Sequence, residues 1–149
     1  MEEKYKPILP EDLFLTAFDR QPTEVELWMG VPSDFHGNRA SGNNFMDLFA
    51  YLIRKHGRKD IQAYAKLMGV SSADLYGAIR AMSGIGAAEW RNRYLVLEAK
   101  ELLEKTTWEI RRISARLGFS QPSVFSKLFQ TYTGKQPFEW RNNWRRRNR

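Results

Sequence analysis

From position 45 onward, apolar residues recur with the period of an α-helix. The i, i+3, i+4, i+7, i+8 spacing of one buried helix face is followed by Phe45, Leu48, Phe49, Leu52 and Ile53. An asparagine before this face is suited to capping the helix, and Gly57 indicates where the helix ends. The same criteria predict six further helices, at about 60–68, 71–84, 87–105, 106–118 and 120–134, with the last one opening at Pro137.

The first 44 residues differ, because prolines and turn-forming residues interrupt the apolar pattern. A short amphipathic helix is predicted by Pro10 followed by Leu13, Phe14, Ala17 and Phe18. Alternating apolar and polar residues predict a short strand over 23–29, and 33–44 has the composition of a loop. We therefore expect an all-α, seven-helix domain at 45–149 behind a short N-terminal extension at 1–44.

An internal repeat divides the helical region into two similar halves. Residues 64–71 read YAKLMGVS and residues 113–120 read ISARLGFS, an offset of 49. Beyond the turn the offset is 50, so the second copy holds one extra residue there; the pairs are Leu75, Ile79 and Gly84 with Phe125, Phe129 and Gly134. Trp90 and Trp140 are also equivalent under this offset, and we expect both in the core rather than as base-stacking platforms.

Each copy has the pattern of a helix, a tight turn and a second helix. Gly69 and Gly118 stand where one helix must stop abruptly, and glycine tolerates the left-handed conformation that such a stop uses. This pattern predicts helix-turn-helix units at 60–84 and 107–133; a generic helical hairpin is the alternative for either copy alone.

The helix predicted over 87–105 would connect the two units. Its length is about 28 Å at 1.5 Å per residue, and successive major-groove faces are about 34–36 Å apart. A rigid linker helix of this size can hold two recognition helices about one DNA turn apart. Its surface is amphipathic, with Tyr94, Leu95, Leu97, Leu102 and Leu103 expected to pack and Arg91, Lys100 and Glu104 expected to face solvent.

Charge is distributed unevenly along the chain. Residues 1–50 contain four Lys/Arg and nine Asp/Glu, a balance of −5, whereas residues 51–149 contain twenty and eight, a balance of +12. The second balance is typical of a protein that binds a polyanion, although charge alone does not separate nucleic acid from an anionic membrane or a solubilising surface. Apolar runs stay short of the roughly 18 residues that a membrane span needs, the N-terminus lacks a secretory signal, and cysteine is absent. We expect a cytoplasmic, nucleoid-associated protein without a membrane partner.

The second half carries a more specific set of residues. It comprises Ile110, Ile113, Ser114, Gly118, Phe119, Phe125, Phe129, Gly134, Pro137, Trp140 and Arg141. At this spacing the set resembles the second helix-turn-helix of the AraC/XylS family of bacterial transcription regulators. The first copy, 60–98, matches more loosely, because Leu95 stands where the family usually has an arginine. The resemblance covers about 45–145 and implies sequence-specific binding of double-stranded DNA by a transcription regulator.

The resemblance also implies which residues face DNA. On the second recognition helix these are Gln121, Pro122, Ser123, Ser126, Lys127 and Gln130, and on the first they are Ser72, Ala73, Tyr76, Gly77 and Arg80. Glutamine and lysine can address base edges, whereas the first set has little hydrogen-bonding reach, so we expect it to contact the DNA backbone. Gly77 is unfavourable inside a helix and would permit close approach of DNA or another helix. Arg141 and Arg145 add a cationic C-terminus, for which a solvated helix end is the alternative.

Three functions remain open at this point: a transcription regulator without a large effector domain, an architectural or accessory DNA-binding protein of a mobile element, and a protein-interaction module with a degenerate first helix-turn-helix. RNA polymerase or another DNA-bound protein is a candidate partner. A homodimer through the extension is a further alternative, because the extension carries Phe14, Phe18, Leu27 and Trp28. His36 and His56 are isolated, and we find no phosphate loop, metal-spaced cluster or activated nucleophile, so we expect no enzyme activity and no cofactor.

Overall fold

The computed structural model describes residues 6–30, 37–38 and 41–148. These residues form one 3₁₀ helix and eight α-helices, with no strand among them: η1 (Pro10–Leu13), α1 (Glu24–Met29), α2 (Asn44–His56), α3 (Ile61–Met68), α4 (Ser72–Ser83), α5 (Ala87–Lys105), α6 (Ile110–Arg116), α7 (Pro122–Thr133) and α8 (Pro137–Arg147). The predicted all-α fold with seven helices from α2 to α8 is confirmed. No helix in the described ranges is both long and apolar enough to cross a membrane.

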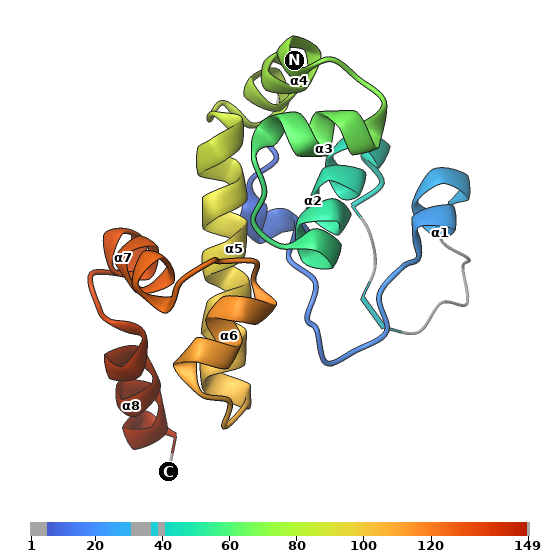
Figure 1. Ribbon diagram of the computed structural model, residues 1–149. Helices are drawn as coiled ribbons and strands as arrows, with labels where there is room; N and C mark the ends of the chain where they lie inside the picture. The colour runs from blue at the N-terminus through green and yellow to red at the C-terminus, as the bar shows by residue number, and fades with distance from the viewer. Residues whose placement is uncertain (1–5, 31–36, 39–40, 149) are drawn as a thin grey trace.

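Helix α5 runs through both halves of the helical domain (Figure 1). It contacts α2 and α4 of the first half and α6, α7 and α8 of the second half. In Figure 1, α4 lies near the start of α5, whereas α6 lies beside its other end. The predicted linker helix therefore forms part of both halves rather than a bare spacer between them.

A single apolar core runs through both halves along α5. In the first half, the Trp90 ring lies 5.3 Å from Phe49 and stacks on Tyr94 at 5.7 Å, between ring centroids. In the second half, Phe129 packs edge-on against Trp140 at 5.8 Å. Both tryptophans thus have the core role that their equivalence in the repeat predicts, although Trp140 is half-buried whereas Trp90 is fully enclosed.

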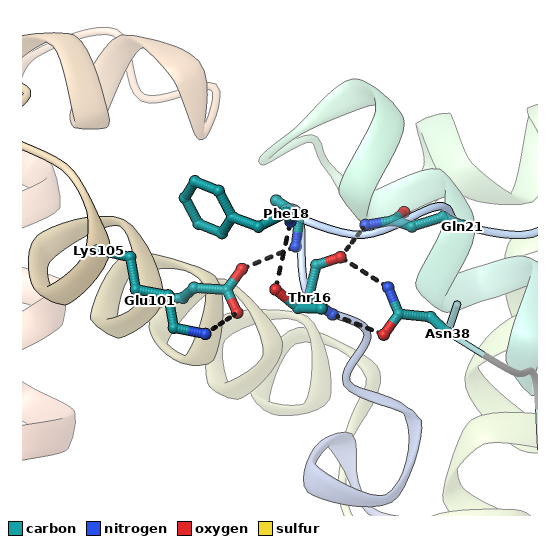
Figure 2. Close-up of polar contacts among 7 residues, drawn as sticks. Thr16, Phe18, Gln21, Asn38, Glu101 and Lys105 are labelled. Atoms are coloured by element: carbon teal, nitrogen blue, oxygen red, sulfur yellow. Dashed lines mark hydrogen bonds and ion pairs between the residues drawn. The ribbon is translucent and has the colours of Figure 1, made fainter. Parts of the chain in front are cut away.

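An N-terminal strap, which we define as residues 8–21, runs along α5 and is bonded to it at several points. The Trp90 indole N–H donates to the Ile8 carbonyl at 3.0 Å, and the Tyr94 hydroxyl donates to the Leu13 carbonyl at 3.2 Å. Further along, the Ala17 N–H donates to the Glu101 carboxylate at 2.7 Å (Figure 2). Leu13 belongs to the main core, so this part of the predicted extension shares its core with the helical domain. The domain boundary at residue 44 stays a prediction.

The two elements predicted in the extension are wrong. Residues 24–29 form helix α1 instead of a strand, because Thr23 and Glu26 form a capping box in which each side chain accepts from the other's backbone N–H, at 3.2 and 2.9 Å. The Leu27 side chain of this helix is buried, and the helix contacts α2. The helix expected after Pro10 is a single 3₁₀ turn, since the chain beyond it bonds to α5. Half of the predicted 33–44 loop, residues 33–36 and 39–40, lies outside the described residues.

The starts of α2, α3 and α4 differ from prediction by one residue, and those of α6 and α7 differ by more. Asn44 already belongs to α2, and its cap is Asn43, whose side chain accepts from the Met46 N–H at 3.0 Å. Helix α6 begins at Ile110 rather than at 106, because the Thr106 hydroxyl donates to the Leu102 carbonyl at 2.6 Å and closes α5. Helix α7 begins at Pro122 rather than at 120, because the extra residue in the second copy lengthens the turn before it.

Candidate nucleic-acid interface

The two helix-turn-helix units, α3–α4 and α6–α7, close their turns in the same way. Gly69 and Gly118 have φ values of +71° and +85°, the left-handed conformation expected of them. The next residue in each turn donates back across the helix end, Val70 N–H to Ala65 O at 3.0 Å and Phe119 N–H to Ser114 O at 3.1 Å. The same bond therefore recurs at the 49-residue offset of the repeat.

Helix α7 presents most of its predicted residues to solvent. Gln121, Pro122, Ser123, Lys127 and Gln130 are exposed, and Ser126 is half-buried. The Lys127 ammonium has no hydrogen bond or salt bridge to any described residue. The Gln130 amide oxygen accepts from the Gln136 side chain at 2.6 Å, so this residue is tied to the start of α8. The freest long polar side chain of this face is therefore Lys127, with Gln121 at the helix cap.

Helix α4 presents a different surface. Ala73, Tyr76, Gly77 and Arg80 are exposed and Ser72 is half-buried. The Arg80 guanidinium donates to the Gly84 carbonyl at 3.2 Å, at the end of its own helix. A Cβ at Gly77 would meet nothing within 4 Å, so no other helix in the described part of the chain approaches this glycine. Packing of another described helix against Gly77 is thus excluded, and close approach of DNA stays a prediction.

Arg141 was predicted to belong to the DNA interface, but its side chain packs inside the protein. It is buried, and its guanidinium donates to the Leu103 carbonyl at 3.0 Å and to the Trp108 carbonyl at 2.6 Å. It thereby fixes α8 to the end of α5 and to the turn before α6. Arg145, by contrast, is exposed and available for a phosphate.

Arg91 has the same role in the first half, which corrects the expectation that it faces solvent. It is buried and donates to the Lys59 carbonyl at 2.7 Å, just before α3. Lys59 and Trp108 are equivalent in the repeat, as are Arg91 and Arg141. Burial is the main cause that lowers the pKa of both arginines. Lys100 and Glu104 are also engaged: both contact Trp140, Lys100 over its ring at 4.8 Å and Glu104 as acceptor from its N–H at 2.9 Å.

The two units are joined by a direct backbone contact as well as by α5. The Arg58 N–H, in the loop between α2 and α3, donates to the Leu117 carbonyl at 2.8 Å. Gly57 and Gly118 line this contact: a Cβ on Gly57 would lie 2.8 Å from the Leu117 oxygen, and one on Gly118 would lie 2.6 Å from the Arg58 nitrogen. The second turn glycine therefore serves both the turn and the junction between units, whereas a Cβ at Gly69 would meet nothing within 4 Å.

Sequence reasoning left out several exposed cations beside the recognition helices. These are Arg58, Lys59 and Lys66 around α3, and Lys135 between α7 and α8. The first helix of such a unit commonly crosses the DNA backbone, so cations next to it are candidates for phosphate contacts. The +12 balance of residues 51–149 was the available signal, but it did not identify which of the cations lie near the two helix-turn-helix units. Within the described ranges, no group of three or more acidic or histidine side chains is placed to hold a metal ion.

Comparison with known proteins places residues 64–143 in a family described as a helix-turn-helix domain. The arabinose operon regulatory protein of Salmonella typhimurium is 32% identical over 82 residues, which are 55% of this chain and 29% of that protein. The regulatory protein PocR of the same organism is 50% identical over 50 residues, 33% of this chain and 16% of that protein. The matched part of the chain thus spans less than a third of either relative.

Among solved structures, the fold is similar to the DNA-binding domain of AdpA, a global transcriptional factor, determined in complex with a target DNA. The TM-score is 0.63 at 23% identity, over 68% of this chain and 93% of that domain. This similarity covers nearly the whole of a two-unit domain and supports the arrangement of α2 to α8 as one fold.

Proposed function

Because the chain belongs to the AraC/XylS family of helix-turn-helix proteins, we propose that it binds double-stranded DNA sequence-specifically and regulates transcription. The observation that carries the proposal is the pairing of two equivalent units, fixed to each other through α5 and the Arg58–Leu117 bond, with exposed polar side chains on α7. Fixed units can enter two successive major grooves without losing orientational freedom when they bind. The protein acts by binding, and no step of this function needs a catalytic group.

The two units have unequal roles in this proposal. On α7, Gln121 and Lys127 have the reach to address base edges, and removing either one should relax base preference at one position, at a cost of about 1–3 kcal/mol. On α4, Arg80 is the long polar side chain, and its guanidinium bonds to the end of its own helix. It suits a phosphate contact, whose loss weakens all sequences alike.

A competition binding assay with cognate and random duplexes tests this division. Lys127→Ala and Gln121→Ala should reduce discrimination between the two duplexes, whereas Arg80→Ala should lower affinity for both by a similar factor. Circular dichroism controls for folding of each variant. If Arg80→Ala selectively abolishes discrimination and the α7 variants keep it, the roles of the two units are reversed.

Salt dependence tests the DNA-binding proposal itself. Each phosphate contact contributes a slope of about −0.9 to log K against log salt, and a two-unit binder with about four to eight contacts should show a steep decline. A slope near zero for duplex DNA between low and physiological salt would rule out duplex binding through the exposed cations.

An architectural or accessory DNA-binding function, for example on a mobile element, is the second candidate. The observation that favours it is the face of α4, where Ala73 and Gly77 are exposed and Asp74 adds a negative charge. Genome-wide mapping of bound sites separates the functions: many promoters indicate a regulator, one element-borne locus indicates an accessory protein, and no sites indicate a protein-interaction module. RNA polymerase or another DNA-bound protein is the protein partner that we propose for a regulator.

We also propose that the protein associates with a second copy through its N-terminal segment, now by way of helix α1. The strand predicted over 23–29 offers no edge for pairing with a second copy, because residues 24–29 form α1. Instead Val25, Trp28 and Met29 are exposed on α1, at 68%, 57% and 83% of their full area. Trp28→Glu should convert a dimer into a monomer in light scattering, and an unchanged mass would remove this interface.

We propose that the protein acts at the nucleoid in the cytoplasm.

A further inference from the structure

A cleft lies between the strap and helices α2, α5 and α6, and none of its lining residues belongs to the predicted DNA-binding set. One part has a volume of about 240 Å³ and an apolar lining formed mainly by Leu15, Phe18, Leu102, Trp108 and Leu117. The other part, of about 310 Å³, is lined mainly by residues with polar or charged groups, which include Gln21, Tyr51, Arg54 and Lys55. Ala17, Glu98 and Arg116 line both parts, so the two cavities adjoin. Volumes of this size fall near the lower end of small-molecule sites, about 300–1,000 Å³.

Glu98 lies where the two cavities meet, and one of its carboxyl oxygens accepts no hydrogen bond from a described residue. Its Oε1 atom is buried and has no hydrogen-bond partner among the described residues. Burial raises the pKa of this carboxyl to about 8, although Arg54 and Arg116 act in the opposite direction. At neutral pH the side chain therefore holds its proton and adds no negative charge to the cleft. An unpartnered buried carboxyl is costly unless something bonds to it.

The cations around the cleft are also left without counterions. Arg54 is buried, and its guanidinium donates to two neutral groups, the Gln21 amide oxygen at 2.9 Å and the Tyr94 hydroxyl at 2.7 Å. Arg116 is exposed and has no hydrogen bond or salt bridge to a described residue. The nearby carboxylate of Glu101 is already occupied by the Ala17 N–H at 2.7 Å and the Lys105 ammonium at 3.6 Å (Figure 2).

We propose that this cleft binds a small amphipathic anion, a carboxylate joined to a flat apolar body. The carboxylate would lie in the cavity lined by Arg54 and Arg116, where protonated Glu98 can donate to it. The apolar body would lie in the other cavity, against Trp108 and Phe18. Phe18 is 53% exposed on the strap, so this aromatic wall of the cavity is accessible from solvent. Because the walls come from α2 of the first half and α6 of the second, the bound anion would contact both halves.

Three probes of the same shape and different charge test the proposal by titration calorimetry on the full chain. We expect 2-naphthoate to bind with one-to-one stoichiometry and at least tenfold more tightly than neutral 2-naphthamide, and 2-naphthylmethylamine not to bind. Arg116→Met should weaken naphthoate about tenfold and leave naphthamide unchanged. Arg111→Met is the matched control, because Arg111 is exposed on the same helix and lines neither cavity of the cleft. Ala17→Phe, at the exposed junction of the two cavities, should abolish binding of both ligands.

Several results would overturn the proposal. One is tighter binding of the amine than of naphthoate, which would assign the site to a cation at an ionised Glu98. Equal effects of Arg116→Met and Arg111→Met would show that only the general positive charge of the protein attracts the probe. Undiminished binding to Ala17→Phe, or no binding of any probe to the wild-type chain, would remove the cleft as a ligand site. The titrations contain no DNA, so these outcomes are independent of the proposed DNA-binding function.

Discussion

Replacing the two turn glycines by alanine should have clearly unequal effects, although the glycines occupy equivalent positions in the repeat. Both have a positive φ, so Gly69→Ala and Gly118→Ala share a conformational cost of about 1–2 kcal/mol for a left-handed L-residue. At Gly69 the added Cβ meets nothing within 4 Å, and this cost is the whole effect. At Gly118 the Cβ would lie 2.6 Å from the backbone nitrogen of Arg58, which cannot be moved aside like the end of a flexible side chain.

The additional cost at Gly118 follows from the contact that must open. The Arg58 N–H to Leu117 O bond of 2.8 Å crosses this junction, and overpacking of this kind costs about 1–3 kcal/mol. We therefore expect Gly118→Ala to lower the free energy of unfolding by about 2–5 kcal/mol, against about 1–2 kcal/mol for Gly69→Ala.

Urea unfolding followed by circular dichroism measures both variants under one condition. The junction also sets the orientation of the two units, so Gly118→Ala should lose more affinity for a duplex with two half-sites than for one with a single half-site. If the two variants differ by less than about 0.5 kcal/mol, below the size expected of any overpacking, the backbone contact between Gly57–Arg58 and Leu117–Gly118 does not hold the units together.

Two further predictions concern buried charged groups. Arg141→Met should lower the free energy of unfolding by about 2–4 kcal/mol, because two backbone carbonyls lose a charged donor. Replacing the exposed Arg145 by Met should leave the free energy of unfolding unchanged and weaken DNA binding at all sequences alike. Equal stability of the two variants would contradict this prediction. Burial raises the pKa of Glu98 in the folded protein to about 8; Glu101 adds to this increase, whereas Arg54 and Arg116 oppose it. The contribution of Glu98 to stability is therefore fully present below about pH 4.5 and is lost as pH rises to about 8. Relative to Glu98→Gln, the wild-type chain should therefore lose a few kcal/mol between pH 4.5 and 8 in urea unfolding at stepped pH, and parallel pH profiles of the two proteins would show that Glu98 does not hold its proton.

Much of the helical domain was predictable because its signals are local. The apolar period of 3.6 residues places α2 to α8, and the capping and turn residues place most of their ends within two residues. The repeat identified both helix-turn-helix units, and the structure repeats even the hydrogen bond of the turn. The exposed residues of α4 and α7 follow from the same period, since a side chain opposite a buried helix face points to solvent.

The N-terminal segment was predicted poorly, because two local signals compete there. The residues from Thr23 to Met29 satisfy both the alternation of a strand and the capping box of a helix, and packing of Leu27 against the body of the protein favours the helix. Residues 14–18 have helical spacing, yet their backbone bonds to side chains of α5 instead. Such competition between local pattern and distant partner is invisible until the partner is placed.

The sequence by itself determined the fold class, the two helix-turn-helix units and the exposed faces of α4 and α7, since each depends on residues close in the chain. The tertiary structure decided which residues of the same type have different roles. Arg91 and Arg141 have the same chemistry as Arg145, but burial beside free carbonyls makes the first two structural. Gly118 differs from Gly69 in its surroundings, because the backbone of Gly57 and Arg58, about sixty residues away in sequence, lies against it. Contacts between distant segments set these roles, because the free energy of a charge or a methyl group depends on what surrounds it in space.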